Sequence, residues 1–189
     1  MHDKILQACI RLFNEKGCRF TLDDIVAELK ISRKTFYKYY LSKEDVLKEI
    51  IDVMHGAVYP QQCDIFEDST LSTEEKLYRC LTLRLPHEDE IDLNRIYEIE
   101  QYYPEVYAYF MGVYEQGWEL TETLLRRGME EGVFRTQSVE LVRSLLESGL
   151  KMLYQGDFLQ RSGLVYHKAL EETVSIILRG IRAEEAKTC

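Results

Sequence analysis

The sequence is poor in the residues that make tight turns, because its 189 residues include only three prolines and ten glycines. A fold made of short strands needs turn residues at roughly every 8–12 positions, so an all-β fold is disfavoured and helices are expected. No apolar run approaches the length of a membrane span, and none is expected. The N-terminus also lacks the apolar segment and the small-residue cleavage site of a secretory signal peptide.

Motifs for metal binding or catalysis are also missing. The five cysteines are an odd number without a C-x-x-C spacing, which favours reduced thiols in a cytoplasmic protein and leaves one disulfide pair as an alternative. His55, His87 and the acidic run 88–90 lack the H-x-x-x-H spacing of a zinc site. No nucleophile–base pair or phosphate-binding loop is evident. We therefore expect no catalytic residues, no metal and no other cofactor.

Positive charge is scarce except in the first quarter of the chain. The net charge is −9, but residues 1–50 hold ten Lys and Arg against eight Asp and Glu, whereas the remainder holds 14 against 25. The first segment is therefore weakly basic and the rest is strongly acidic. An acidic body repels a polyanion everywhere except where the basic segment would meet it, so the distribution permits nucleic-acid binding without proving it.

The first 50 residues contain the start and stop signals of several short helices. Apolar residues from Ile5 to Phe13 recur at helical spacing, and Gly17 ends this first helix. Thr21, three positions before Asp24, caps a second helix; Ser32 caps a third over residues 33–40; Ser42 caps a fourth. Three short capped helices with a tight turn between the second and third predict a helix-turn-helix.

The third helix has a polarity suited to DNA. At 100° per residue, Phe36 and Tyr40 lie about 40° apart and face the core, while Lys34 and Lys38 lie on the opposite side. The solvated face holds cations, hydroxyls and aromatic rings but no acid, whereas an ordinary surface helix mixes both signs of charge. Lys43 begins the fourth helix, where the helix dipole disfavours a cation unless an anion such as phosphate is present.

The segment from Ile5 to Ile50 resembles the DNA-binding domain of the tetracycline-repressor (TetR) family. The matching motifs are A-x-x-x-L-F-x-x-x-G (8–17), Thr21, I-V-A (25–27), I-S-x-x-T-F-Y (31–37) and Y-Y-L-S-K-E-D-V-L (39–47). The resemblance implies phosphate contacts from Thr21, Thr35, Tyr37, Tyr39 and Lys43, and base contacts from Arg33, Lys34 and Lys38.

This sequence departs from the family pattern at two positions. Lys30 replaces the glycine that is usual in the turn, which would cost roughly 1 kcal/mol if this residue has a positive φ. Lys34 replaces a residue that is commonly small, which affects the preferred operator more than the fold. Neither departure removes a phosphate contact.

The rest of the chain is expected to be helical as well. The fourth helix should end before Pro60, residues 60–70 should connect, and further helices are expected at about 72–85, 89–102, 104–131, 138–159 and 165–182. The predicted fold is all-α, with about nine helices. A three-helix DNA-binding domain (1–47) is joined to a larger helical effector-binding and dimerisation domain (48–189).

Two sets of apolar residues in this larger domain suggest binding surfaces. The last two helices carry wide apolar faces, which favour a homodimer over a monomer that buries them internally. The proposed interface is Leu145, Gly149, Met152, Leu153, Leu170, Val174, Ile177, Leu178 and Ile181.

Residues 97–118 are dense in aromatic side chains, which either line an apolar ligand pocket or pack as core. The identity of an effector does not follow from them. The candidate ligand-binding residues are Met54, Val58, Leu81, Tyr97, Tyr107, Phe110, Tyr114 and Trp118.

The leading hypothesis is a ligand-responsive transcriptional regulator, a repressor that binds a pseudo-palindromic DNA operator as a dimer. A first alternative is a helical small-molecule-binding protein whose helix-turn-helix is vestigial. A second is a helical enzyme, for which Glu98, Glu100 and His87 are the nearby acid–base candidates.

Overall fold

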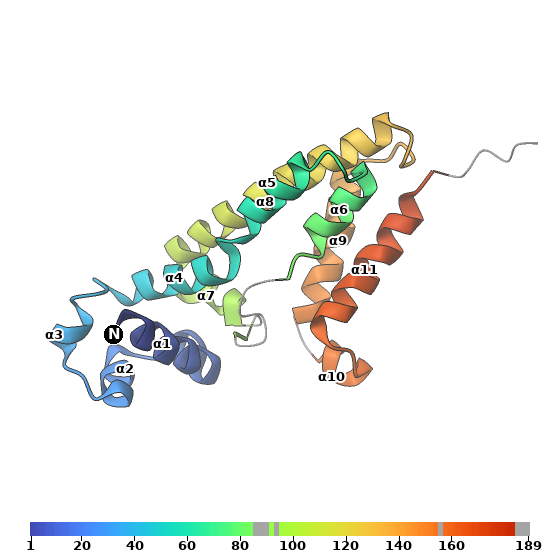
Figure 1. Ribbon diagram of the computed structural model, residues 1–189. Coiled ribbons are helices and arrows are strands. Elements are labelled where there is room, and N and C mark those ends of the chain that lie inside the picture. The colour runs from blue at the N-terminus through green and yellow to red at the C-terminus, as the bar shows by residue number, and fades with distance from the viewer. Residues whose placement is uncertain (85–90, 93–94, 155–156, 184–189) are drawn as a thin grey trace, which may run out of the picture. The chain divides into compact units, whose positions relative to one another are not determined.

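The computed structural model describes residues 1–84, 91–92, 95–154 and 157–183, and nearly all of these ranges are helical (Figure 1). An isolated antiparallel bridge pairs Phe134 with Arg182. The predicted all-α fold is confirmed. The helices are α1 (His2–Lys16), α2 (Leu22–Leu29), α3 (Arg33–Phe36), α4 (Lys43–His55), α5 (Val58–Glu67), α6 (Thr73–Leu81), α7 (Ile96–Tyr102), α8 (Pro104–Glu130), α9 (Val139–Tyr154), α10 (Phe158–Ser162) and α11 (Tyr166–Ile181), with a 3-10 helix, η1 (Gly17–Arg19), after α1.

The chain packs as two compact units. The first comprises Met1–Val58 and Leu85–Glu115, and the second comprises Tyr59–Arg84 and Gln116–Cys189. The long helix α8 therefore contributes its first half to one unit and its second half to the other. The functional division predicted at residue 47 is a different kind of boundary and stays a prediction.

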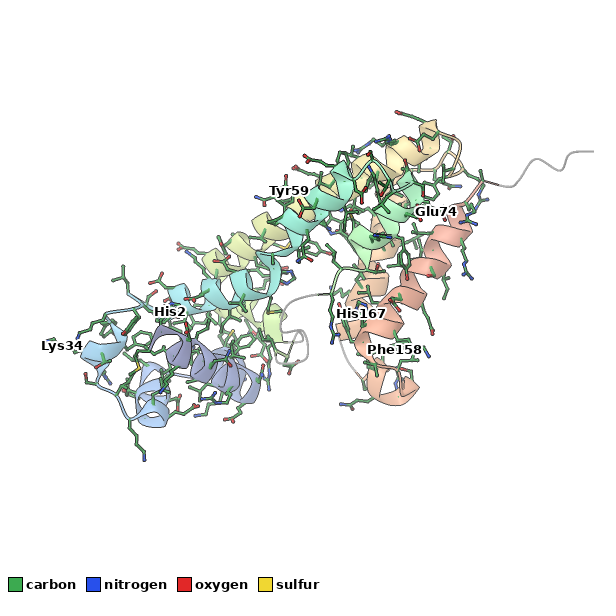
Figure 2. All side chains as sticks on the ribbon, viewed as in Figure 1. His2, Lys34, Tyr59, Glu74, Phe158 and His167 are labelled. Carbon is green, nitrogen blue, oxygen red and sulfur yellow. The ribbon has the colours of Figure 1, made fainter. Side chains whose placement is uncertain are left out.

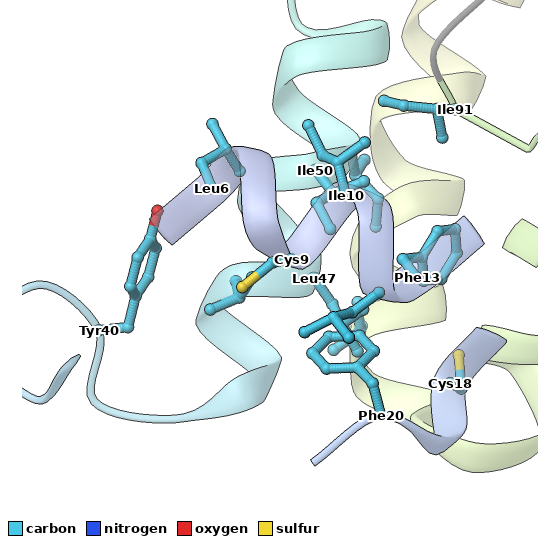
Figure 3. Close-up of a cluster of buried hydrophobic side chains, with 14 of the residues drawn as sticks. Leu6, Cys9, Ile10, Phe13, Cys18, Phe20, Tyr40, Leu47, Ile50 and Ile91 are labelled. Atoms are coloured by element: carbon cyan, nitrogen blue, oxygen red, sulfur yellow. The ribbon is translucent and has the colours of Figure 1, made fainter. Parts of the chain in front are cut away.

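The core of the first unit is built around α1. Figure 3 shows Cys9, Ile10 and Phe13 of α1 packed with Leu47 and Ile50 of α4, and each of these five side chains is at most 2 % exposed. Burying one such side chain contributes about 1.5–3 kcal/mol. This apolar contact fixes α1 against α4, and the short helices α2 and α3 attach to that base.

Side-chain caps define where three helices begin, and those at Thr21 and Ser42 were predicted. Thr21 starts α2, Ser42 starts α4 and Ser72 starts α6. In each case the hydroxyl accepts a hydrogen bond from the backbone N–H three residues on, and the acid at that later position accepts one from the backbone of the capping residue. Each box satisfies N–H groups that a helix end otherwise leaves unpaired.

Several predicted elements differ in extent from the structure. The helix expected over 89–102 begins, as α7, at Ile96, and the one expected over 138–159 ends, as α9, at Tyr154 and is followed by α10. The third helix ends at Phe36 instead of residue 40, because the N–H groups of Lys38 and Tyr39 bond three residues back and tighten the chain into a turn. Residues 60–70 were expected to be a connection, but most of them belong to α5. Pro60 lies in the first turn of that helix, where its missing N–H removes no intrahelical bond.

In the second unit, α9 and α11 lie side by side (Figure 1). Their close approach depends on Gly149, because a Cβ at this position would lie 2.7 Å from the Thr173 methyl carbon. The buried faces of the two helices include Leu146 and Val174. No helix in the described ranges is long and apolar enough to cross a membrane.

The described cysteines are free thiols: Cys9, Cys18 and Cys80 are buried, and Cys63 is half-buried. Burial raises the pKa of Cys9 and of Cys80 to about 12. Such thiols remain protonated near neutral pH, which keeps them unreactive. Cys189 lies outside the described residues.

Candidate nucleic-acid interface

A tight turn at Lys30 sets the direction of α3 relative to α2. Lys30 has φ 53° and ψ 42°, the left-handed conformation that glycine adopts most easily. Its N–H and that of Ile31 donate to carbonyls at the end of α2, with the Ile31 nitrogen 3.1 Å from the Val26 oxygen. The chain therefore reverses within two residues and enters α3 at Ser32, whose hydroxyl accepts from the Thr35 N–H at 3.1 Å.

The segment from α3 to Tyr39 buries one side and exposes the other. Phe36 and Tyr40 are 1 % and 4 % exposed, as the helical spacing predicted. Tyr37 and Tyr39 are 51 % and 43 % exposed, and Lys34 lies on the outside of α3 (Figure 2). Within the described ranges the amines of Lys34 and Lys38 have no intramolecular partner. These cations and phenols are available to a ligand outside the protein.

Arg33 differs from the other exposed cations because it is paired. Its guanidinium donates to the Asp23 carboxylate of α2, with the closest nitrogen and oxygen 2.6 Å apart. Asp23 of α2 thus places an acid at the edge of the α3 face, although α3 itself contains no acidic residue. Both side chains are more than 60 % exposed, with fractions of 63 % and 67 %. Such a pair contributes about 0–1 kcal/mol, so a phosphate or a base edge can replace Asp23.

Lys43 has an intramolecular site that the sequence did not reveal. Its Nζ donates to the carbonyl oxygens of Cys18 at 2.7 Å and Phe20 at 2.5 Å. The same ammonium lies 4.1 Å from the centre of the Phe20 ring and 5.0 Å from that of Tyr103. Two carbonyls and two aromatic faces supply the negative partial charge for which a phosphate was expected. The conflict between this cation and the helix dipole is therefore relieved within the chain.

The two threonines of the predicted phosphate set also have structural roles. Thr21 lies exposed at the start of α2, and its hydroxyl donates to Asp24 at 2.8 Å. Lys16 and Thr21 hold the pKa of the Asp24 carboxyl at about 2 through hydrogen bonds. Thr35 is half-buried, with its hydroxyl 2.9 Å from that of Ser32. The predicted DNA-binding residues thus connect α2 with α3 and η1 with α4, while their contacts with DNA stay predictions.

The predicted ligand-binding residues are divided between the two units. In the first unit, Met54 and Phe110 are buried in the core, and the rings of Tyr107 and Tyr114 lie 6.0 and 5.8 Å from that of Phe110. In the second, Trp118 is 4 % exposed and lies 5.2 Å from the Arg143 guanidinium. These five predicted residues fit the alternative of core packing. Val58 and Leu81 are half-buried, and the Tyr97 side chain lies outside the described residues. Their meeting in one cavity stays a prediction.

A cleft in the first unit was not anticipated. It has a volume of about 570 Å³ and lies beside η1 and α7. Gly17 has a positive φ, and the space a Cβ would occupy there is taken by the Glu98 carboxylate, which accepts the Cys18 N–H at 3.2 Å. The lining is polar and contains none of the predicted ligand-binding residues: Glu15, Lys16, Arg19, Arg95, Glu98, Gln101 and Tyr102.

Of the acid–base candidates of the enzyme hypothesis, Glu98 and Glu100 both lie on α7. Glu98 is occupied by the Cys18 N–H and by Arg95, whose guanidinium lies 2.7 Å away. His87 and the acidic run 88–90 lie outside the described residues. His55 is half-buried, its ring centre lies 5.2 Å from that of Phe110, and desolvation lowers its pKa to about 4.

The predicted dimer residues fall into two groups. Leu145 and Met152 are 51 % and 41 % exposed, and Gly149 and Ile177 are half-exposed. The other five are buried by the chain's own packing: Leu153, Leu170, Val174, Leu178 and Ile181. Helix periodicity located both helices but did not separate the internal face from the outer one. Two exposed residues of these helices, Leu141 and Ile176, are not among the predicted interface residues.

Comparison with known proteins supports the interpretation of the N-terminal segment. The family model of bacterial regulatory proteins, tetR family, matches residues 5–50. The sequence is 24 % identical over 186 residues to an uncharacterized HTH-type transcriptional regulator, YvaF, of Bacillus subtilis (strain 168). These 186 residues cover 98 % of this chain and 97 % of that protein.

Solved structures share the fold over nearly the whole chain. The fatty acid degradation regulator FadR from Bacillus halodurans matches with a TM-score of 0.74 and 20 % identity, covering 97 % of each chain. FadR from Bacillus subtilis, solved in complex with stearoyl-CoA, matches with a TM-score of 0.72 and 15 % identity over 96 % of this chain and 100 % of that one.

Proposed function

Since this chain is a DNA-binding transcriptional regulator of the TetR family, and not an enzyme, we propose that it is a ligand-responsive repressor that binds a pseudo-palindromic operator as a homodimer. The observation that carries the proposal is the exposed, acid-free face of the segment from Lys34 to Tyr39, which follows the turn at Lys30. The protein acts in the cytoplasm, where its operator DNA is found.

Within each subunit, α3 enters the major groove. Lys34, Lys38 and Arg33 reach base edges, and Arg33 exchanges its exposed partner Asp23 for DNA. The exposed phenols of Tyr37 and Tyr39 donate to phosphate oxygens. Two such helices one helical turn apart, roughly 34–36 Å, would read the two half-sites.

The first turn of α4 is the proposed phosphate anchor beside α3. The Ser42 hydroxyl takes the Asp45 N–H, whereas the N–H groups of Lys43 and Glu44 have no partner within the helix and are available to an incoming anion. The Lys43 ammonium, bound to two carbonyls in this structure, contributes to the local positive potential and shifts to a phosphate when DNA arrives. Thr21 and Thr35 add hydroxyl contacts at the neighbouring helix starts.

The proposed dimer uses the outer faces of α9 and α11. Leu141, Leu145 and Met152 form an exposed apolar stripe on α9, and α11 adds the exposed side chain of Ile176. A stripe that none of the described residues covers is expected to pack against its symmetry copy. Arg143 of α9 does not place its charge on this stripe, because its guanidinium pairs with Glu122 and Glu147.

The effector is proposed to be a small molecule with an apolar part that binds beside the aromatic side chains of Tyr107, Phe110 and Tyr114 in the first unit. The stearoyl-CoA complex of the Bacillus subtilis relative supports an effector site in this fold. The effector controls DNA binding only if it binds two conformations with different affinities. A change in the separation of the two α3 helices is the simplest such difference.

Selection of bound duplexes from a random pool tests the proposal directly. The purified full chain should enrich a two-fold symmetric sequence, and Lys34→Ala should weaken binding to it and alter the preferred bases. Lys168→Ala, which removes an exposed lysine of α11, is the matched control and should bind like the wild type. Ligand binding without any enriched sequence would instead favour a small-molecule-binding protein with a vestigial helix-turn-helix.

Oligomeric state is tested separately by light scattering. Leu145→Glu places a charge in the exposed α9 stripe and should convert the dimer to monomers. Thr136→Glu adds the same charge at an exposed position before α9 and should leave the dimer intact. A wild-type chain that elutes as a monomer at micromolar concentration would contradict the dimer.

A further inference from the structure

His2, at the start of α1, contacts the chain that follows α3. Its ring stacks on that of Tyr40, with centroids 5.3 Å apart and planes 20° apart. The Tyr39 ring lies 6.2 Å away at a tilt of 53°. Figure 3 shows Tyr40 beside the beginning of α1, and Figure 2 locates His2 there. A residue near the N-terminus thus touches the two aromatic residues that link α3 to α4.

Polar contacts extend this stack to α4. The His2 Nε2 lies 3.1 Å from a Glu49 carboxylate oxygen and 3.2 Å from the Tyr40 hydroxyl, and its Nδ1 lies 3.5 Å from Asp3. Burial and the hydrogen bond to Glu49 raise the pKa of Tyr40, so this phenol keeps its proton and donates it. Glu49 therefore accepts hydrogen bonds from both rings, which joins α1, the turn after α3 and α4.

This joint compensates for a weak part of the interface. In the turn from Tyr37 to Tyr39 the N–H groups of Lys38 and Tyr39 bond only three residues back, and the Tyr39 ring is 43 % exposed. Little within the turn itself therefore fixes the direction of the Tyr39 phenol. The His2 ring covers the side of Tyr40 and Tyr39 that faces α1, while remaining 44 % exposed itself.

We propose that His2 is a positioning residue for DNA binding, which orients Tyr39 toward the phosphate backbone through its stack on Tyr40 and its hydrogen bond to Glu49. The proposal rests on the proposed function, because it takes Tyr39 as a DNA contact. His2 itself touches no phosphate. Its effect on affinity must therefore pass through Tyr39 and release no additional counterion.

A double-mutant cycle tests this role, with a fluorescently labelled duplex of the enriched sequence as the probe. His2→Ala should weaken binding about fivefold, comparable to the loss of one hydrogen bond. In a Tyr39→Ala background the same change should have little further effect, since interacting residues are not additive. His2→Phe restores the stack and should recover part of the affinity. Gln7→Ala, at an exposed position of α1, should change nothing.

Three results would overturn the proposal. The first is a His2→Ala protein that is folded and binds as tightly as the wild type while Lys34→Ala binds more weakly; the interface would then stand without a role for His2. The second is that His2→Ala lowers the DNA affinity by the same factor in the wild-type protein and in the Tyr39→Ala protein. The third is that His2→Ala reduces the slope of log K against log salt concentration by about the amount expected for one phosphate contact, which would make His2 a direct phosphate contact. If Lys34→Ala also had no effect, the proposed interface itself would fail.

Discussion

Replacing Lys43 with alanine should destabilise the first unit as well as weaken DNA binding. The lost contacts are two charge-assisted hydrogen bonds, from Nζ to the carbonyls of Cys18 and Phe20, and the approach to two aromatic rings. Hydrogen bonds to a charged group contribute about 1.5–3 kcal/mol each. Water reaches this half-exposed site and replaces part of the loss, so we expect a decrease of roughly 2–3 kcal/mol in the free energy of unfolding.

The matched variant is Lys34→Ala, because the Lys34 amine has no partner within the described ranges. A surface change of this kind usually alters the free energy of unfolding by less than about 0.5 kcal/mol. Both variants should bind an enriched duplex more weakly, by roughly tenfold or more for a lost base contact. Lys43→Ala should weaken binding to all sequences alike, whereas Lys34→Ala should change the order of preference among them.

Urea unfolding followed by circular dichroism, with fluorescence anisotropy for DNA, separates the two effects. For a chain of this length, a loss of about 2–3 kcal/mol corresponds to a fall in Tm of about 4–12 °C. An unchanged urea midpoint for Lys43→Ala would show that the two carbonyls contribute nothing to stability. Unchanged affinity for every duplex would show that Lys43 has no role in phosphate binding.

Three further predictions concern the backbone and the pH dependence of the first unit. Lys30→Gly should raise the free energy of unfolding in urea by about 0.5–1 kcal/mol, since it removes the cost of a left-handed lysine. A lower free energy of unfolding would contradict the observed φ of 53°. Gly17→Ala should destabilise the chain by more than Gly132→Ala does, because both glycines have positive φ but only Gly17 faces the Glu98 carboxylate, and equal losses would disprove that contact. The pKa of Asp24 is lowered to about 2, so its stabilising contribution is present above the ordinary pKa near 4 and is lost as the pH falls toward 2; Asp24→Asn should flatten acid unfolding monitored in this range, and an unaltered curve would argue against the shift.

The parts of the interface that depend on local chemistry could be predicted from the sequence. Capping by Thr21 and Ser42 involves an acid three residues away, so the whole interaction lies within one short stretch. The burial of Phe36 and the exposure of Lys34 follow from the period of a helix. The cost assigned to a left-handed Lys30 depended on a positive φ, and the structure has one.

Interactions between distant parts of the chain could not be predicted in the same way. The carbonyls that bind Lys43 lie more than 20 positions earlier, and no pattern of side chains marks a backbone oxygen as a partner. The joint between His2 and Glu49 spans 47 positions and was missed for the same reason. Helix α5 was missed because Pro60 was interpreted as a breaker, although it is compatible with the first turn of a helix.

The salt dependence of binding to an enriched duplex tests the central claim most directly, since it counts the phosphates neutralised by the protein. With three to four cations per subunit drawn from Arg33, Lys34, Lys38 and Lys43, a dimer should give a slope of log K against log salt concentration of roughly −5 to −7. A slope near zero would contradict phosphate-led binding by this helix-turn-helix.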